Sequence, residues 1–196
     1  MMGTSLNCEI KYIENFLPAE VADTLYRELI DQYQIESLKV QLNPLDKSIL
    51  SDYSKLMFMD QDLYATNKFP EEHWGKTAVW SPQLLSIRKR VEEITNKIFK
   101  ICVCIYYPDG NSGVDFHSDY LAFGDTNLIP SLSIGAERAF LLREKSTQKL
   151  HQFHLAKGSL FIMGKDCQQN YEHSLPINPE YKKGRINLTF RPYGFD

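Results

Sequence analysis

His117, Asp119 and His173 have the side chains and the spacing of a divalent metal site. Residues two apart in a strand point to the same side, so His117 and Asp119 can reach one ion from a single backbone segment. His173, in the later segment EHSLP, can complete the set from a second strand. Two imidazoles and one carboxylate on one face of an ion leave its opposite positions open. Non-haem iron(II) oxygenases use this arrangement to bind a cosubstrate and dioxygen.

An isolated His-x-Asp pattern is common by chance, so each ligand has a plainer alternative. His117 fits equally a histidine in a surface turn, and His173 a capping or core histidine. The remaining histidines fit a metal site less well. His151 and His154 are three apart, and a strand would place them on opposite faces. His73 lies in the loop-like segment PEEHWG. We expect these three to be structural or exposed.

The C-terminal segment RINLTFR alternates polar and large apolar residues. Read as a strand, it places four polar side chains on one face: Arg185, Asn187, Thr189 and Arg191. Arginines that point into a barrel need an anionic partner, and a dicarboxylate supplies one because guanidinium and carboxylate pair in a two-pronged geometry. The alternative is a pair of surface salt bridges on an edge strand. The strict alternation instead favours two faces with different functions.

Two amphipathic helices are expected in the first half of the chain. The first runs from about Pro18 to Tyr33, where apolar residues recur every fourth position. The second runs from about Pro82 to Phe99, with Ser81 as a plausible N-cap. Residues 34–76 hold strand-like pieces (LKVQL, KLMFM) broken by turn residues and are hard to assign.

After the second helix the pattern changes to short segments rich in β-branched and aromatic residues. They are KICVCIYY, SLSIG, RAFLLRE, KLHQFHL, GSLFIMG and RINLTFR, separated by turn residues. Two helices followed by six or more short strands predict an α+β fold that is mainly β. Regularly spaced short strands indicate a sandwich or barrel, with the helices packed on one outer face.

Length and composition limit the class of protein. A chain of 196 residues predicts one domain. No apolar run is long enough for a membrane helix, and the N-terminus lacks the pattern of a secretory signal, so we expect no membrane partner and a cytoplasmic location. The four cysteines are expected to be reduced thiols rather than disulfides or a zinc site. The net charge of -3 neither supports nor excludes a nucleic-acid partner.

With these motifs in view, the chain resembles the AlkB family of iron/2-oxoglutarate oxygenases from about Trp80 to Tyr193. The segments that carry the resemblance are YYPDGNSGVDFHSD, PSLSIGAERAFLLR, GSLFIMG and HSLP followed by RINLTFR. The resemblance implies a double-stranded β-helix (jelly-roll) core in a single domain spanning residues 1–196. Residues 1–80 would carry an N-terminal helix and a substrate lid, and residues 81–196 a helix and the jelly-roll core.

The resemblance also implies the cofactors and their contacts. Fe(II), 2-oxoglutarate and O2 would be used, with the metal on His117, Asp119 and His173. The 2-oxoglutarate contacts map onto Tyr107, Arg185, Asn187 and Arg191. Of the two arginines, Arg185 is favoured for the distal carboxylate and Arg191 for the end near the metal.

The chain departs from the family at positions that bear on the substrate. Ile105 stands where the family often has an asparagine that contacts 2-oxoglutarate. Repair members carry an acidic residue just after the metal aspartate, which reads a base amino group, whereas this chain continues with Tyr120 and Leu121. A pocket without such a bond discriminates weakly between 3-methylcytosine and 3-methylthymine. The lid region matches poorly and offers only Phe58 and Tyr64 for stacking.

Three functions remain as hypotheses. The first is oxidative N-demethylation of alkylated bases in single- or double-stranded DNA or RNA, as in AlkB-like DNA repair, by a monomer that is cytoplasmic, or nuclear in a eukaryote. Its substrate would contact Phe58, Tyr64, Tyr120 and Leu121, or stack on His117 itself. The second is hydroxylation or demethylation of a small metabolite or a protein side chain. The third is a catalytically silent β-barrel that binds a ligand, which the complete triad and both arginines argue against.

Overall fold

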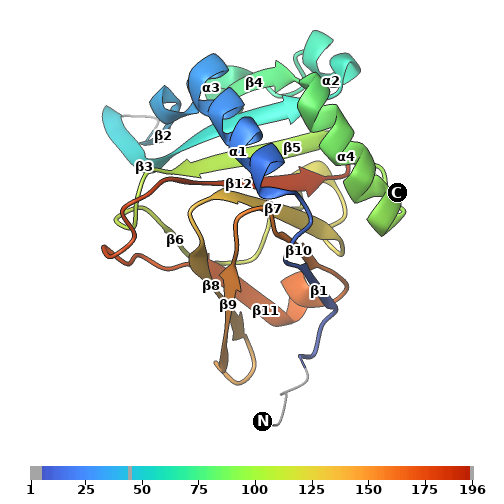
Figure 1. Cartoon of the computed structure of the whole chain (residues 1–196), viewed down its shortest axis with the longest axis vertical. Helices are drawn as coiled ribbons and strands as arrows, with labels where there is room; N and C mark the ends of the chain where they lie inside the picture. Colours follow the sequence, from blue (N-terminus) through green and yellow to red (C-terminus); the bar gives the residue numbers. More distant parts are fainter. Residues whose placement is uncertain (1–5, 44–45, 195–196) are drawn as a thin grey trace.

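The computed structural model describes residues 6–43 and 46–194. Within them, a larger sheet has the strand order β1-β10-β7-β12-β5-β3-β2, with β4 pairing in parallel beside β3 and all other neighbours antiparallel (Figure 1). Its strands are β1 (Ile10–Ile13), β2 (Lys39–Asn43), β3 (Asp46–Met59), β4 (Lys76–Val79), β5 (Ile101–Tyr107), β7 (Ile129–Gly135), β10 (Leu160–Met163) and β12 (Arg185–Arg191).

A smaller antiparallel sheet has the order β6-β11-β8-β9. Its strands are β6 (Val114–His117), β8 (Arg138–Glu144), β9 (Leu150–Leu155) and β11 (Tyr171–Leu175). Side chains of both sheets line one cavity, so the two sheets enclose it between them. This is the mainly β, jelly-roll architecture that the strand pattern and the family resemblance predicted.

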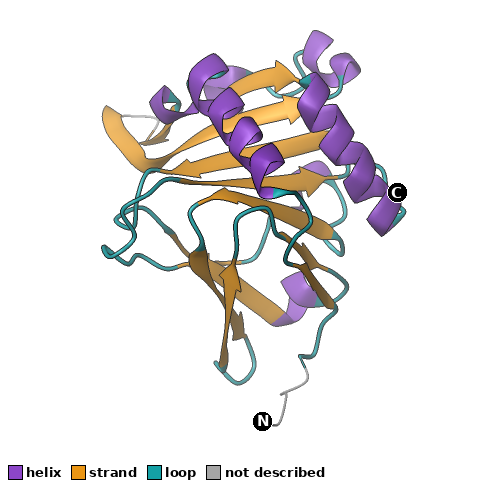
Figure 2. Ribbon diagram, viewed as in Figure 1, coloured by secondary structure: helices purple, strands orange, loops and turns teal. Residues whose placement is uncertain are grey.

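The two longest helices cover one face of the larger sheet, as expected (Figure 2). They are α1 (Ala19–Arg27), which continues as the π-helical segment η1 (Glu28–Gln32), and α4 (Pro82–Thr95). Shorter helical segments are η2 (Ile35–Ser37), α2 (Gln61–Ala65), α3 (Glu71–Trp74), η3 (Leu121–Phe123) and α5 (Cys167–Asn170). Among the described helices, none combines the length and the apolar character needed to cross a membrane.

The second helix ends four residues before the position that its apolar pattern predicted. Ser81 caps its start as expected, because the Ser81 side chain accepts a hydrogen bond from the backbone N–H of Leu84. Its end is set by Asn96, which adopts the left-handed conformation (φ 51°) that terminates many helices. The chain then turns, so Phe99 enters the core as part of a loop rather than from a helix face.

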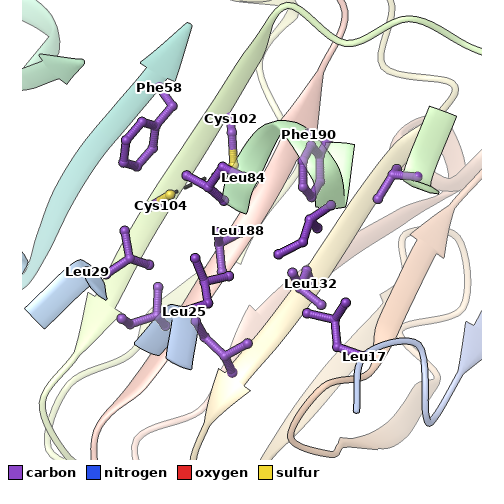
Figure 3. Close-up of a cluster of buried hydrophobic side chains, with 14 of the residues drawn as sticks. Leu17, Leu25, Leu29, Phe58, Leu84, Cys102, Cys104, Leu132, Leu188 and Phe190 are labelled. Carbon is purple, nitrogen blue, oxygen red and sulfur yellow. Dashed lines mark hydrogen bonds between the residues drawn. The ribbon is translucent and has the colours of Figure 1, made fainter. Parts of the chain in front are cut away.

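The main core lies between the helices and the larger sheet (Figure 3). Ile186, Leu188 and Phe190 of β12 are fully buried there, together with Leu25 of α1 and Leu84 of α4. The polar residues of β12 face the opposite way, into the cavity. The interpretation of RINLTFR as a strand with two different faces is therefore confirmed. All four cysteines are free thiols, and the neighbouring pair at the centre of the sheet, Cys102 and Cys104, belongs to this core.

Leu188→Ala is expected to lower the free energy of unfolding by about 2–5 kcal/mol, because it removes a fully buried side chain from a strand paired on both edges. Denaturant titration followed by circular dichroism measures the change. Leu85→Ala on the exposed side of α4 is the matched control, with an expected change within about 0.5 kcal/mol. Equal effects of the two substitutions would contradict this placement of the core.

Candidate active site

Two histidines and one aspartate converge at the edge of the smaller sheet. The antiparallel pairing of β11 with β6 sets His173 directly opposite His117, and their ring centroids are 4.3 Å apart. His173 Nε2 lies 3.8 Å from Asp119 Oδ2. One ligand atom from each of the three residues lies within 4.8 Å of the others, which makes them the one group able to hold a metal ion among the described residues.

Asp119 reaches this point by a route that strand alternation did not predict. β6 ends at His117, so Asp119 stands outside the strand. Its backbone N–H donates a 2.8 Å hydrogen bond to Gln168 Oε1 of α5. The neighbouring Ser118 hydroxyl donates to the carbonyl of Tyr171 at 3.1 Å. These two bonds attach the loop of Asp119 to β11 and α5, and sequence reasoning missed both Gln168 and Ser118.

The two imidazoles are prepared to bind a metal through their unprotonated nitrogens. His117 Nδ1 lies 2.8 Å from the carbonyl oxygen of Asp115, so Nδ1 carries the proton and Nε2 remains free as a ligand. Burial lowers the pKa of His173 to about 4, although the charge of Asp119 opposes the shift. His173 is therefore neutral near pH 7, the form in which imidazole binds a metal. His151 and His154, on β9, take no part in the cluster, as expected.

A cavity of about 310 Å³ opens beside the cluster, between the two sheets. The polar face of β12 lines it with Arg185, Asn187, Thr189 and Arg191, and β5 adds Tyr107. The structure thus brings every residue expected to contact 2-oxoglutarate to one cavity. Ile105, which replaces the family's asparagine, lies in the same wall opposite Asn187 of β12.

Arg185 is a buried cation with an incomplete set of partners. Its side chain is 2% exposed, and its Nη2 donates to Ser133 Oγ at 2.9 Å and to Asn187 Oδ1 at 3.2 Å. Its Nε is buried and has no hydrogen-bond partner among the described residues. Burial lowers the pKa of Arg185 to about 10, which the nearby Tyr107 opposes. An anionic ligand would satisfy both the free donor and the charge.

Arg191 lies at the metal end of the same face. Its Nη2 lies 3.1 Å from Asp119 Oδ1, while its Nη1 is buried without a partner in the described part of the chain. The two arginines therefore approach the cavity from its two ends. The expected order, in which Arg185 takes the distal carboxylate and Arg191 the end near the metal, stays a prediction.

Two serines of β7 complete the polar wall, and sequence reasoning missed them. Ser133 binds Arg185, and the Ser131 hydroxyl donates to Asn187 Oδ1 at 2.7 Å. Asn187 in turn donates from Nδ2 to Thr189 Oγ1 at 3.0 Å. The alternating serines of the segment SLSIG were a signal of a polar face, because residues two apart share a face of a strand.

The expected substrate residues are only partly brought together. Tyr120 lines the cavity and is 82% exposed. Leu121 is exposed beside it but does not line the cavity, and Tyr64 is exposed on α2 away from it. Phe58 was wrong as a stacking residue, because it is fully buried in the core on the helix side of the sheet (Figure 3).

Other side chains from residues 1–80 line the cavity in place of Phe58. They are Tyr53 and Lys55 of β3 and Trp74 of α3. Trp74 packs edge-on against Phe69 and contacts Phe123, which fixes its ring in the cavity wall. Trp74 stands in PEEHWG, in the part of the sequence that was hard to assign, and no local pattern marked it.

The residues present fit a divalent iron ion and a dicarboxylate. The metal cluster supplies two neutral nitrogens and one carboxylate, a donor set suited to iron(II). The partnerless Nε of Arg185 and Nη1 of Arg191 are buried donors that an anion with two carboxylates could satisfy. The geometry therefore fits a metal-dependent enzyme with an anionic cosubstrate.

Comparison with known proteins identifies the family. The family model of the 2OG-Fe(II) oxygenase superfamily matches residues 9–191, and the chain belongs to that superfamily. The prediction of a dioxygenase that uses Fe(II), 2-oxoglutarate and O2 is thereby confirmed at the level of the family. Similarity to AlkB homologues also confirms the resemblance noted in the sequence.

The most similar proteins differ in how much of each chain is matched. Uncharacterized protein R406 of Acanthamoeba polyphaga mimivirus is 28% identical over 174 residues, which cover 87% of this chain and 88% of that protein. The mouse alpha-ketoglutarate-dependent dioxygenase alkB homolog 3 is 34% identical over 122 residues, 57% of this chain and 43% of the mouse protein. The mouse DNA oxidative demethylase ALKBH2 is 36% identical over 123 residues, 57% and 51% respectively. The match thus spans about half the length of these mammalian relatives.

Solved structures support the fold. OsALKBH1 superposes with a TM-score of 0.66 at 16% identity, covering 96% of this chain and 100% of that one. A prolyl-4-hydroxylase of Pseudomonas putida superposes with a TM-score of 0.53 at 14% identity, covering 96% and 95%. At these identities the likeness concerns the fold alone.

Proposed function

We propose that this chain catalyses oxidative N-demethylation of alkylated bases in DNA or RNA. His117, Asp119 and His173 would hold Fe(II), and Tyr107, Arg185, Asn187 and Arg191 would hold 2-oxoglutarate. Together with dioxygen, the bound iron and cosubstrate supply the oxidation that hydroxylates an N-methyl group, whose product loses formaldehyde. The observation that carries this proposal is the single cavity shared by the metal cluster, the two incompletely paired arginines and Trp74.

The protein's own residues would bind, orient and shield the reactants. Arg185 and Arg191 would pair with the two carboxylates of the cosubstrate and orient it toward the metal cluster. Trp74 lies in the cavity wall, and Tyr120 offers an aromatic face at the exposed edge of the cavity, on which a flipped or single-stranded base can stack. The apolar lining around them excludes water from the reacting methyl group.

The organisation of the chain follows from this proposal. Residues 1–196 would act as one monomeric domain in the cytoplasm or nucleus. The substrate lid would lie within residues 1–80, since this part supplies Tyr53, Lys55 and Trp74 to the cavity wall. The relatives named for DNA demethylation support a nucleic-acid partner for this chain.

A second candidate is hydroxylation or demethylation of a small metabolite or a protein side chain. The poorly matching lid region favours it, because Phe58, one of its two stacking candidates, is buried in the core. The same site and the same chemistry would serve both functions, so only the substrate separates them.

The proposal predicts loss of methyl groups from methylated single-stranded oligonucleotides incubated with the protein, Fe(II), ascorbate and 2-oxoglutarate. Product mass and released formaldehyde measure the reaction. Asp119→Ala is the matched negative control, since it removes a proposed metal ligand. Turnover of 2-oxoglutarate without demethylation of any oligonucleotide would overturn the proposal and favour the second candidate.

A further inference from the structure

Lys55 is a cation in the cavity wall that the proposed chemistry does not use. It lies on β3 opposite Ile105 of β5 and lines the cavity. Its Nζ lies 5.6 Å from the ring centroid of Trp74, so the ammonium stands over the indole ring. Cation and ring together form one side of the substrate end of the cavity.

No acidic side chain in the described part of the chain pairs with Lys55. Within residues 6–43 and 46–194, Lys55 forms no ion pair, and burial lowers its pKa with no carboxylate nearby to oppose the shift. Among the residues that line the cavity, Asp119 is the single acid. Asp119 already pairs with Arg191 and belongs to the metal cluster. The substrate therefore meets an uncompensated positive charge.

The position of Lys55 separates it from the cosubstrate residues. β3 is two strands away from β12, which carries the arginines. At roughly 4.8 Å between neighbouring strands, their backbones are about 10 Å apart. The Lys55 ammonium is also directed over Trp74 rather than toward Arg185 or Arg191. A dicarboxylate held by both arginines would occupy their end of the cavity and leave Lys55 to face the substrate.

We propose that Lys55 makes this enzyme prefer neutral, carbonyl-bearing methylated bases to cationic ones. This inference rests on the proposed function and specifies its substrate. Methylation at N3 leaves thymine or uracil neutral, with a carbonyl oxygen on each side of the methylated nitrogen. Such an oxygen accepts a charge-assisted hydrogen bond from an ammonium group. Methylation of cytosine at N3 or adenine at N1 leaves a positive charge, which the ammonium repels.

The structure thus changes the expectation from sequence. Tyr120 and Leu121 alone predicted weak discrimination between 3-methylcytosine and 3-methylthymine, because no carboxylate follows the metal aspartate. Lys55 adds a charge that acts against the cationic lesions and in favour of the neutral ones. The Trp74 ring already holds the Lys55 ammonium over its face, so its attraction for a cation is directed at Lys55 rather than at a cationic base.

The test compares two single-stranded oligonucleotides that differ only in carrying 3-methylthymine or 3-methylcytosine. We expect kcat/KM of the holoenzyme to be about tenfold or more higher for 3-methylthymine. Lys55→Met should reduce this ratio to near one, and Lys55→Glu should reverse it. Lys89→Met, an exposed site on the helix side of the sheet, is the control for charge and should keep the wild-type ratio.

Two further measurements distinguish a failure of the proposed role of Lys55 from a failure of the proposed function. The concentration of 2-oxoglutarate that gives half-maximal turnover should be unchanged in Lys55→Met, and thermal unfolding reports whether each variant is folded. Demethylation with an equal ratio in wild type and Lys55→Met would overturn the role of Lys55 while leaving the proposed function intact. A raised 2-oxoglutarate requirement with an unchanged ratio would assign Lys55 to the cosubstrate instead. Absence of demethylation on these and every other methylated oligonucleotide offered, with turnover of 2-oxoglutarate retained, would overturn both proposals.

Discussion

Asp119→Ala and His117→Ala are each expected to abolish binding of Fe(II) near neutral pH, the largest effect that the site predicts. Each change leaves two protein ligands on a labile divalent ion. Asp119 is the single carboxylate of the cluster, so its loss also removes the negative charge that faces the metal. Anaerobic titration with Fe(II), followed by calorimetry or by metal analysis after gel filtration, measures the loss.

His151→Ala and His154→Ala are the matched controls, because both histidines lie on β9 of the same small sheet outside the cluster. Both should bind iron like the unmodified protein. Circular dichroism should show that Asp119→Ala remains folded, although Arg191 loses its partner there. Retained iron in His117→Ala together with lost iron in His151→Ala would refute the proposed ligand set.

Arg185→Ala is expected to raise the concentration of 2-oxoglutarate required for half-maximal turnover by about tenfold to a hundredfold. A hydrogen bond to a charged group contributes about 1.5–3 kcal/mol, and Arg185 is a buried side chain that lines the cavity. Arg185→Lys should recover part of the loss, because lysine keeps the charge but lacks the planar fork of donors. Steady-state turnover at varied 2-oxoglutarate measures the effect.

The fold should tolerate Arg185→Ala, which makes the measurement informative. In the free protein Arg185 is a buried cation with an unpaired Nε, and removal of such a group relieves a desolvation cost. Arg27→Ala, at an exposed position on α1, is the control for the loss of one arginine. An unchanged 2-oxoglutarate requirement in Arg185→Ala would count against the arginine pair as the cosubstrate site.

Sequence alone determined the features that depend on local pattern. Alternation in RINLTFR predicted both faces of β12, because the side chains of a strand alternate whatever its neighbours are. Ligand chemistry singled out His117, Asp119 and His173, since few residue types bind iron(II). The existence of the two long helices followed from apolar periodicity. The end of α4 did not, because the left-handed turn at Asn96 stops the helix while apolar residues continue beyond it.

Tertiary structure alone decided which side of β3 faces the cavity. Phe58 and Lys55 stand three apart on that strand and therefore point to opposite faces. Pairing of β3 with β5 in one register sends Phe58 under the helices and Lys55 into the cavity. A shift by one residue would exchange the two faces, and no local property of residues 46–59 sets that register. It depends on β5 and on the helices that cover the sheet, which are distant in sequence. For the same reason, Trp74 could be recognised as part of the cavity wall only from the folded structure.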